Sequence, residues 1–189
     1  TMKYNPKLLE DLPQLPGFQG LHPLQDEATV QGALALLHHA EEVFSAITGM
    51  DAFTLQPAAG AHGELTGLLI IKAALTEQGE SGRDTILIPD SAHGTNPASA
   101  ALVGFKVQTV PTSSAGVIEP ETLKPYLGPN VAGLMLTNPN TLGLFEEKIL
   151  SITKMIHEAG GLVYCDGANM NAILGWARPG DMGFDLIHL

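Results

Sequence analysis

The sequence predicts an α/β protein built on a mostly parallel, doubly wound sheet. Short runs rich in apolar and β-branched residues alternate with helical stretches, as in chains where helices connect parallel strands. Two of these runs, 86–88 and 134–136, are continuously apolar, which is typical of strands covered by helices on both faces. We therefore expect an open sheet with crossover helices on its two sides.

The expected elements can be placed in chain order. Asp26 precedes apolar positions at three- and four-residue spacing up to Ile47, and Gly49 follows, so this stretch predicts a capped amphipathic helix. Beyond it the predicted strands are 52–56, 85–88, 106–110, 133–137 and 162–165, and the predicted helices start at Gly63, Asn96, Pro120 and Glu146.

The first 25 residues differ in composition from the rest of the chain. They contain four prolines and few periodic apolar positions, which predicts an extended arm lying on another surface. The expected organisation is thus an N-terminal extended arm, 1–25, followed by one domain, 26–189.

Charge and cysteine content exclude several classes of function. Aspartate and glutamate outnumber lysine and arginine by 20 to 9, so the net charge of −11 disfavours nucleic acid as a partner. No apolar stretch is long enough to span a membrane. The single cysteine, Cys165, excludes an internal disulfide and fits a reducing compartment, so a cytoplasmic location is expected. Any bound phosphate must be held by local backbone N–H groups.

Four loops with unusual composition follow the predicted strands, at 56–64, 89–97, 137–143 and 166–171. In open α/β sheets, ligands bind where such loops leave the carboxyl ends of the strands. Gly60-Ala61-His62-Gly63 leads into a helix and predicts a phosphate seat made of backbone N–H groups. An ordinary tight turn explains the same residues, and His62 could contact the ligand or cap the helix. The spacing of NAD- and ATP-binding glycine motifs is absent.

Asp166 and His93 are the candidate catalytic residues. Asp166 ends an apolar strand, and opposite a heterocyclic nitrogen its charge would favour the protonated ring. Capping of the following turn is the alternative for this residue. His93 stands among small polar residues, where its ring could stack on a flat cofactor or simply be exposed. Asn138 offers an amide to a substrate or cofactor, although an Asn-Pro turn accounts for it equally well.

The remaining histidines and the cysteine are expected to be structural. None of these histidines has metal-ligand spacing with a carboxylate partner, so no metal site is predicted. The thiol is expected to be buried and inert. The residues concerned are His22, His38, His39, His157 and Cys165.

Three ordered strings, 60–64 (GAHGE), 91–100 (SAHGTNPASA) and 166–172 (DGANMNA), followed by 178–181 (RPGD), carry a resemblance to a known family. They resemble the P-protein of the glycine cleavage system, glycine dehydrogenase (decarboxylating), in its catalytic half. In many bacteria that half is a separate protein, subunit 2. The likeness runs from about residue 21 to 189. It implies the large domain of a pyridoxal-phosphate (PLP) transferase with the aspartate-aminotransferase-like fold, fold type I.

The resemblance also implies a reaction and partners. The family decarboxylates glycine and transfers the aminomethyl group to the lipoyl group of the H-protein. It implies assembly with P-protein subunit 1 into a hetero-oligomer. The implied cofactor-binding residues are Gly60, Ala61 and His62 at the phosphate, His93 at the ring, Asp166 at the pyridine nitrogen, Asn169 near the ring hydroxyl, and Thr95. Which of His62, Thr95 and Asn138 touches substrate stays open.

One departure from the family concerns lysine. The family places its Schiff-base lysine a few residues beyond Leu189, and none of the seven lysines here lies in a loop beside Asp166. The chain is therefore expected to lack part of the large domain and the small domain. It would bind PLP only non-covalently and be inactive alone.

Three other functions remain as alternatives. Another enzyme of the same fold, such as a cysteine desulfurase or an amino-acid decarboxylase, would share the alternation of elements. A non-catalytic partner subunit could keep the fold without the chemistry. A nucleotide-binding α/β domain is the third alternative.

Overall fold

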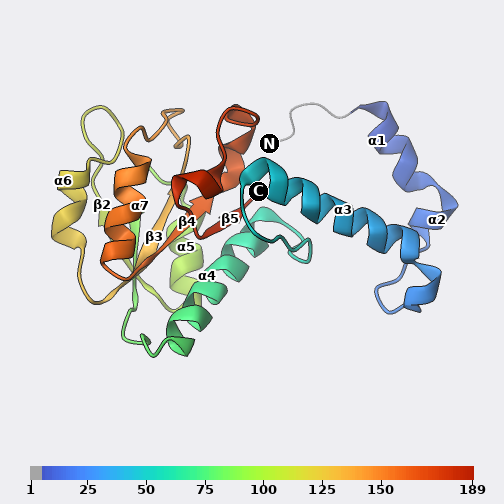
Figure 1. Cartoon of the computed structure of the whole chain (residues 1–189), viewed down its shortest axis with the longest axis horizontal. Coiled ribbons are helices and arrows are strands. Elements are labelled where there is room, and N and C mark those ends of the chain that lie inside the picture. The colour runs from blue at the N-terminus through green and yellow to red at the C-terminus, as the bar shows by residue number, and fades with distance from the viewer. Residues whose placement is uncertain (1–5) are drawn as a thin grey trace.

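A parallel five-stranded sheet forms the centre of the computed structural model, which describes residues 6–189 (Figure 1). The order of strands across the sheet is β2-β1-β3-β4-β5, and all four neighbouring pairs are parallel. The predicted α/β class is confirmed. The strands are β1 Thr85–Pro89, β2 Lys106–Val110, β3 Val131–Thr137, β4 Leu162–Asp166 and β5 Leu186–His188.

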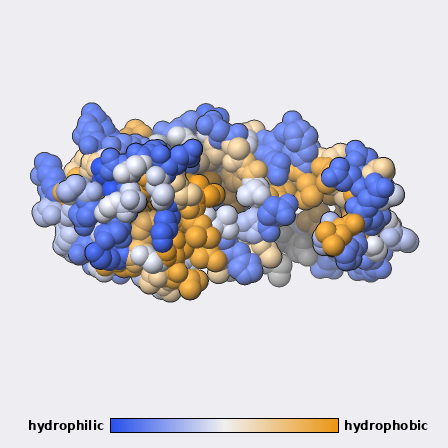
Figure 2. Space-filling view, turned by 90° about the horizontal axis from the view of Figure 1, so that it is seen from below, coloured by the Kyte–Doolittle hydropathy of each residue, from blue (hydrophilic) through white to orange (hydrophobic). Residues whose placement is uncertain are grey.

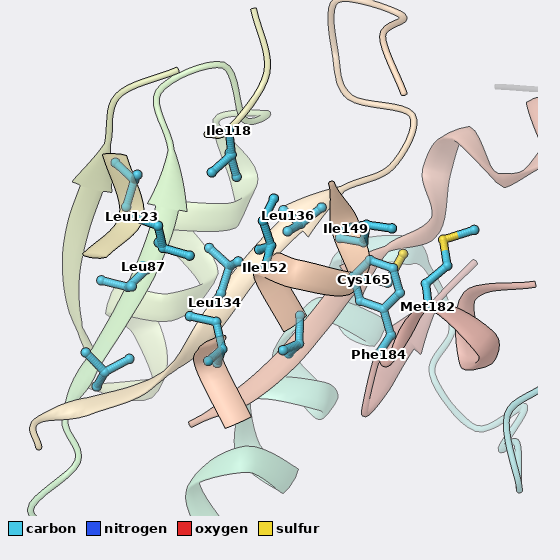
Figure 3. Close-up of a cluster of buried hydrophobic side chains, with 14 of the residues drawn as sticks. Leu87, Ile118, Leu123, Leu134, Leu136, Ile149, Ile152, Cys165, Met182 and Phe184 are labelled. Atoms are coloured by element: carbon cyan, nitrogen blue, oxygen red, sulfur yellow. The ribbon is translucent and has the colours of Figure 1, made fainter. Parts of the chain in front are cut away.

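Helices cover both faces of this sheet, as the continuously apolar strands predict. Helices α4 and α5 pack on one face, and α6 and α7 contribute to the core on the other. Successive residues of a strand point to opposite faces, so Leu134 enters one core and Met135 the other. Figure 3 shows the core on the α7 face. The helices are α4 Gly60–Glu77, α5 Thr95–Val103, α6 Pro120–Leu123 and α7 Ile149–Glu158.

The strand order reverses at the carboxyl ends of β1 and β3, beside the end of β4. From β1 the chain passes through α5 to β2 on one side, and it then returns to form β3 on the other side of β1. The loops that leave β1 and β3 therefore diverge. A crevice at such a point of reversal is where open α/β sheets bind their ligands.

The predicted strand at 52–56 is wrong. This segment has no regular structure and pairs with no strand among the described residues. Strand geometry is maintained by hydrogen bonds to a neighbouring strand, and the N–H of Gln56 instead donates to the Thr54 hydroxyl, 3.3 Å away. The other four predicted strands are present, with ends that differ by at most two residues. A short fifth strand, β5, was not predicted.

Two predicted helix starts also need correction. Helix α4 begins at Gly60 instead of Gly63, because the backbone of Ala59 is extended and its carbonyl already accepts a hydrogen bond from the N–H of Gly63. Helix α7 begins at Ile149 instead of Glu146. Glu146, at the predicted start, is held by a long-range contact instead, because its carboxylate accepts the N–H of Ile118 at 2.9 Å.

The N-terminal arm is helical in short pieces, so the prediction of an extended backbone is wrong for the described part of 1–25. Proline is tolerated in the first turn of a helix, where its missing N–H is not needed, and Pro16 holds that place in α2. The first five residues of the predicted arm lie outside the described residues. The pieces are α1 Lys7–Asp11, a 3₁₀ turn Leu12–Gln14 and α2 Pro16–Gln19.

Helix α3, Gln31–Thr48, is the predicted long helix and ends at Gly49, whose φ of 73° is left-handed. Asp26 caps the short 3₁₀ turn before α3 instead of α3 itself, through the N–H of Ala28 at 2.9 Å. Figure 1 shows α3 and the arm projecting away from the sheet. Apolar residues are exposed there and in the middle of the face that Figure 2 shows. Within residues 6–189, no helix combines the length and apolar character needed to cross a membrane.

The fit of α4 against β4 depends on Gly67. A Cβ at this position would stand 2.2 Å from Cε2 of the buried Tyr164, so Gly67→Ala should force the ring or the helix to move. We expect a loss of roughly 1–3 kcal/mol in the free energy of unfolding, measured by urea denaturation. The matched control is Gly32→Ala in α3, which meets nothing within 4 Å and should be neutral or slightly stabilising. Equal midpoints for the two variants would contradict this account of the packing.

Candidate functional site

Asp166 lies at the carboxyl end of β4, and its side chain is almost fully buried. It faces the α4 side of the sheet, because Tyr164, two residues before it, belongs to that core. Oδ1 of Asp166 stands 3.2 Å from Nε2 of His188 on β5, and it also accepts the N–H of Ala168 at 3.0 Å. Asp166 therefore caps the turn after β4, which was the alternative interpretation, and its place in a ligand cleft stays a prediction.

These contacts keep Asp166 charged. Burial disfavours the charged form, but the hydrogen bonds from His188 and from the N–H of Ala168 outweigh it, so the pKa of Asp166 lies below its ordinary value. The nearby amide of Asn96 acts in the same direction, although its geometry falls short of a regular hydrogen bond. The strand end thus presents a fixed negative charge inside the protein.

His188 connects Asp166 to the start of α4. Its Nδ1 lies 2.9 Å from the hydroxyl of Tyr164, and that hydroxyl donates to the carbonyl of Gly63 at 3.1 Å. Burial raises the pKa of Tyr164, with the charges of Glu64 and Asp166 adding to the effect, so its hydroxyl stays protonated. The approach is close, since a Cβ on Gly63 would stand 2.9 Å from Cβ of His188.

Glu64, the next residue on α4, is a second buried carboxylate. Its Oε1 accepts the hydroxyl of Thr95 and its Oε2 the hydroxyl of Ser99, each at 2.7 Å. The Thr95 hydroxyl is in turn 2.8 Å from Nδ1 of His93. One oxygen or nitrogen from each of Glu64, Asp166 and His188 lies within 4.8 Å of the others, so two carboxylates and an imidazole share this region.

The structure thus brings together the start of α4, the loop after β1 and the end of β4. The first turn of α4, with Gly60, Ala61 and His62, is exposed and has no side-chain cap. Its first N–H groups have no partner within the helix and are available to an anion. His93 is exposed beside this region. Its exposure is compatible both with stacking on a flat cofactor and with simple contact with solvent.

Two other predicted residues have structural contacts instead. Asn138 is buried, its Oδ1 accepts the N–H of Glu146 at 3.0 Å, and its Nδ2 lies 3.8 Å from Sδ of Met182. Asn169 donates through Nδ2 to the carbonyls of Pro139 and Asn140, at 3.0 and 3.3 Å. These bonds join the loops that follow β3 and β4.

Buried polar atoms without partners stand in the same region. Asn96 is fully buried with both amide atoms unpaired, and the hydroxyl of Thr137 is buried and unpaired. Thr137 is aligned with Asp166 on the neighbouring strand. Unpaired buried polar groups are costly, and they are expected where a polar ligand completes the hydrogen bonding.

Beside the cluster lies a groove with a volume of about 990 Å³. It runs between residues 49–60, α4 and β5, and its lining includes Gly60, Gly63 and His188. Asp166 and His93 are not part of this lining. The groove therefore meets the candidate site only at the start of α4 and at β5.

Sequence reasoning missed four residues of this site. Glu64 belongs to the string 60–64, but its burial follows only from the packing of α4 in the folded chain. His188 becomes a neighbour of Asp166 only through the register of β5 against β4. Asn96 and Thr137 became candidates only when their burial without partners was known. Cys165 is buried, and burial raises the pKa of its thiol, as expected of an inert cysteine.

The charge on Asp166 predicts a dependence of stability on pH. A carboxyl group with a lower pKa in the folded than in the unfolded state stabilises the fold above the unfolded pKa, and this contribution is lost as the pH falls through the folded pKa. The free energy of unfolding should therefore decrease as the pH drops below 3.8, the ordinary value for aspartate.

Asp166→Asn should remove this part of the acid sensitivity and cost roughly 1.5–3 kcal/mol near pH 7, the scale of hydrogen bonds to charged groups. Urea denaturation at several pH values measures both effects. Asp51→Asn, at an exposed position, is the control and should keep the wild-type slope. An unchanged slope in Asp166→Asn would mean that Asp166 is not held in its charged form.

Comparison with known proteins gives a consistent result, although no family model matches the chain. The chain is 61% identical over all 189 residues to proteins named as probable glycine dehydrogenase (decarboxylating) subunit 2 from Desulforamulus reducens and Caldanaerobacter subterraneus subsp. tengcongensis. It is 59% identical to the protein of that name from Thermococcus gammatolerans. The chain spans only 38–39% of the length of these relatives.

Solved structures show the same fold. Glycine decarboxylase (P-protein) of the glycine cleavage system, in inhibitor-bound form, matches with a TM-score of 0.75 at 24% identity, over 95% of this chain and 39% of that one. SspA in complex with cysteine has a TM-score of 0.71 at 16% identity, over 97% of this chain and 53% of that one. Mouse CSAD matches with a TM-score of 0.63 at 15% identity, over 78% of this chain and 34% of that one. The predicted fold type I is confirmed. Over its whole length the chain is therefore similar to glycine dehydrogenase (decarboxylating) subunit 2, and it spans about 39% of the length of those relatives.

Proposed function

We propose that the chain forms the cofactor-binding part of a glycine decarboxylase that uses PLP. The full protein would decarboxylate glycine and transfer the remaining aminomethyl group to the lipoyl group of the H-protein. The observation that carries this proposal is the buried, charged Asp166 beside unpaired polar side chains, in a chain 61% identical to the named relatives. Those relatives are named as a second subunit, which supports assembly with P-protein subunit 1.

The residues present fit a phosphorylated, polar aromatic ligand. Backbone N–H groups of Gly60, Ala61 and His62 at the uncapped start of α4 would hold the phosphate, since a helix N-terminus favours negative charge. Asn96 and Thr137 have buried, unpaired polar atoms near the strand ends, and a polar ligand bound there would give them partners. The acidic chain offers no general attraction for phosphate, so this local arrangement must supply it.

Each of three further side chains has a distinct proposed role. The carboxylate of Asp166 would hold a proton on the pyridine nitrogen, because a fixed negative charge stabilises the positive form. The ring of His93 would stack on the cofactor and keep water from one face. Asn169 would hold the loop after β4 in place beside the ring, through its bonds to the loop after β3. Bound PLP would supply an electron sink for the carbon that loses carbon dioxide.

Thr95 and Asn138 have supporting roles in this proposal, in place of the predicted contacts with cofactor or substrate. We assign Thr95 to the support of His93, because its hydroxyl lies between Nδ1 of His93 and the carboxylate of Glu64. We assign Asn138 to the structure of the loop after β3, because its amide is buried and bonded to protein atoms at both ends. The substrate contact would then come from other residues.

The described lysines do not reach this site. Five of the six make ion pairs or hydrogen bonds to groups other than Asp166, for example Lys72 with the carbonyl of Val103 and Lys106 with Asp84. The sixth, Lys7, is in α1, within the projecting arm. We therefore propose that this chain alone holds PLP non-covalently and is inactive, and that the lysine is supplied by the remainder of the full-length protein.

The proposal is tested by spectroscopy and by an exchange assay. PLP added to this chain should change the visible spectrum without forming an adduct that borohydride fixes. A full-length protein that contains this sequence, with its companion subunit and H-protein, should exchange carbon dioxide with glycine. Asp166→Asn should lower that exchange by roughly 100-fold or more, the scale of a lost electrostatic contact to the reacting group.

Asp11→Asn, at an exposed position in α1, serves as the control and should leave exchange unchanged. A borohydride-stable adduct on this chain would contradict the assignment of the lysine. Absence of exchange in the full-length complex would favour a non-catalytic partner subunit.

A further inference from the structure

Glu64 is a buried carboxylate that the proposed chemistry does not use directly. It lies on the first turns of α4, and only 5% of its surface is exposed. Both of its oxygens accept hydroxyl hydrogen bonds at 2.7 Å, from Thr95 and from Ser99 on α5. An ionised carboxylate accepts hydrogen bonds and donates none, so both hydroxyl protons point towards Glu64.

This arrangement determines which nitrogen of His93 carries the proton. The Thr95 hydroxyl has one proton, and it is committed to Glu64. The 2.8 Å contact between the Thr95 oxygen and Nδ1 of His93 then favours Nδ1 as the donor. The backbone N–H of Thr95 donates to Nδ1 at 3.3 Å and favours the opposite tautomer, so the 2.8 Å contact and this longer bond compete.

We propose that Glu64 is a positioning residue which, acting through Thr95, fixes the tautomer and orientation of His93. The neutral ring carries its proton on Nδ1, and Nε2 is left with a free lone pair. In other sites a carboxylate orients a histidine through a direct hydrogen bond. Here the hydroxyl group of Thr95 lies between the carboxylate and the histidine. The importance of this tautomer for catalysis rests on the proposed function, whereas its existence does not.

The orientation of the ring follows from the same bonds. His93 is exposed and lies on a loop, and the two contacts of its Nδ1 with Thr95 hold the plane of its ring. A ring that must lie flat on a cofactor gains from being held in place before the ligand arrives. Glu64 is well suited to anchor it, because Ser99 holds the other oxygen and keeps the carboxylate from rotating.

The experiment observes the imidazole directly. A full-length protein that contains this sequence, carrying ¹⁵N-labelled histidine, is studied by NMR without cofactor at a pH where the His93 ring is neutral. Assignment uses a His93→Gln variant. The expected wild-type pattern is protonated Nδ1 and unprotonated Nε2. Thr95→Ser keeps the hydroxyl and should keep this pattern. Thr95→Val and Glu64→Gln should shift the population towards the Nε2–H form, which predominates for free imidazole side chains in water.

Ser99→Ala is the matched control. It removes the bond to the other oxygen of Glu64 but leaves the path to His93 intact, so the Nδ1–H pattern should remain. A merely structural role for Glu64, as a pin between α4 and α5, would make Ser99→Ala and Thr95→Val behave alike. An Nε2–H ring in the wild type, or the same tautomer in Thr95→Val and wild type, would overturn the proposal.

A second readout uses the cofactor. In the full-length complex, Glu64→Gln and Thr95→Val should lower kcat for carbon dioxide exchange by about 10–100-fold, the scale seen for partners that orient a reacting group. Thr95→Ser should stay near wild type. If PLP does not bind at all, the proposed function fails while the tautomer result still stands, so the two failures are distinguishable. Unchanged kcat in both variants would contradict the positioning role.

Discussion

The buried charge of Asp166 is the constraint on which the rest of the site depends. A carboxylate removed from water is stable only when nearby groups replace its lost hydration, and here His188 and the N–H of Ala168 do so. His188 can serve only because β5 pairs with β4 in the register that places the two side chains opposite each other. The chemistry of one side chain therefore depends on the pairing of an edge strand.

The site also depends on the close packing of α4 against the sheet. His188 and Tyr164 reach the start of α4 because Gly63 and Gly67 leave room for them. The same approach brings Glu64 near Asp166, so two carboxylates share one buried region with His188. Two adjacent negative charges would repel each other, and the two hydroxyl donors to Glu64 and the histidine beside Asp166 compensate for this. The small residues of α4 are thus part of the electrostatics of the site.

How far the sequence predicts this molecule depends on whether a feature is local. Strands β1, β3 and β4 were predictable because each is a largely apolar run that is buried on both faces. Strand β2 is exposed at four of its five positions, and its β-branched residues are what indicated it. The segment 52–56 looks like a strand locally, but strand formation requires a partner, and the described chain supplies none. The arm was misjudged for a related reason, since proline is compatible with a helix in the first turn as well as with an extended chain.

The same distinction explains the site. Asp166 and His93 could be nominated from the sequence because their neighbours mark them, as a strand end and as a loop of small polar residues. Glu64 and His188 were missed because a charged residue in a helix and a histidine near the end of the chain are unremarkable until the fold buries them. The proposed role of Glu64 depends on the direction of two hydroxyl hydrogen bonds. The donors, Thr95 and Ser99, are separated from Glu64 by 31 and 35 positions in the sequence. Residue types can nominate the groups that touch a ligand, whereas the groups that hold them in place are defined by tertiary packing.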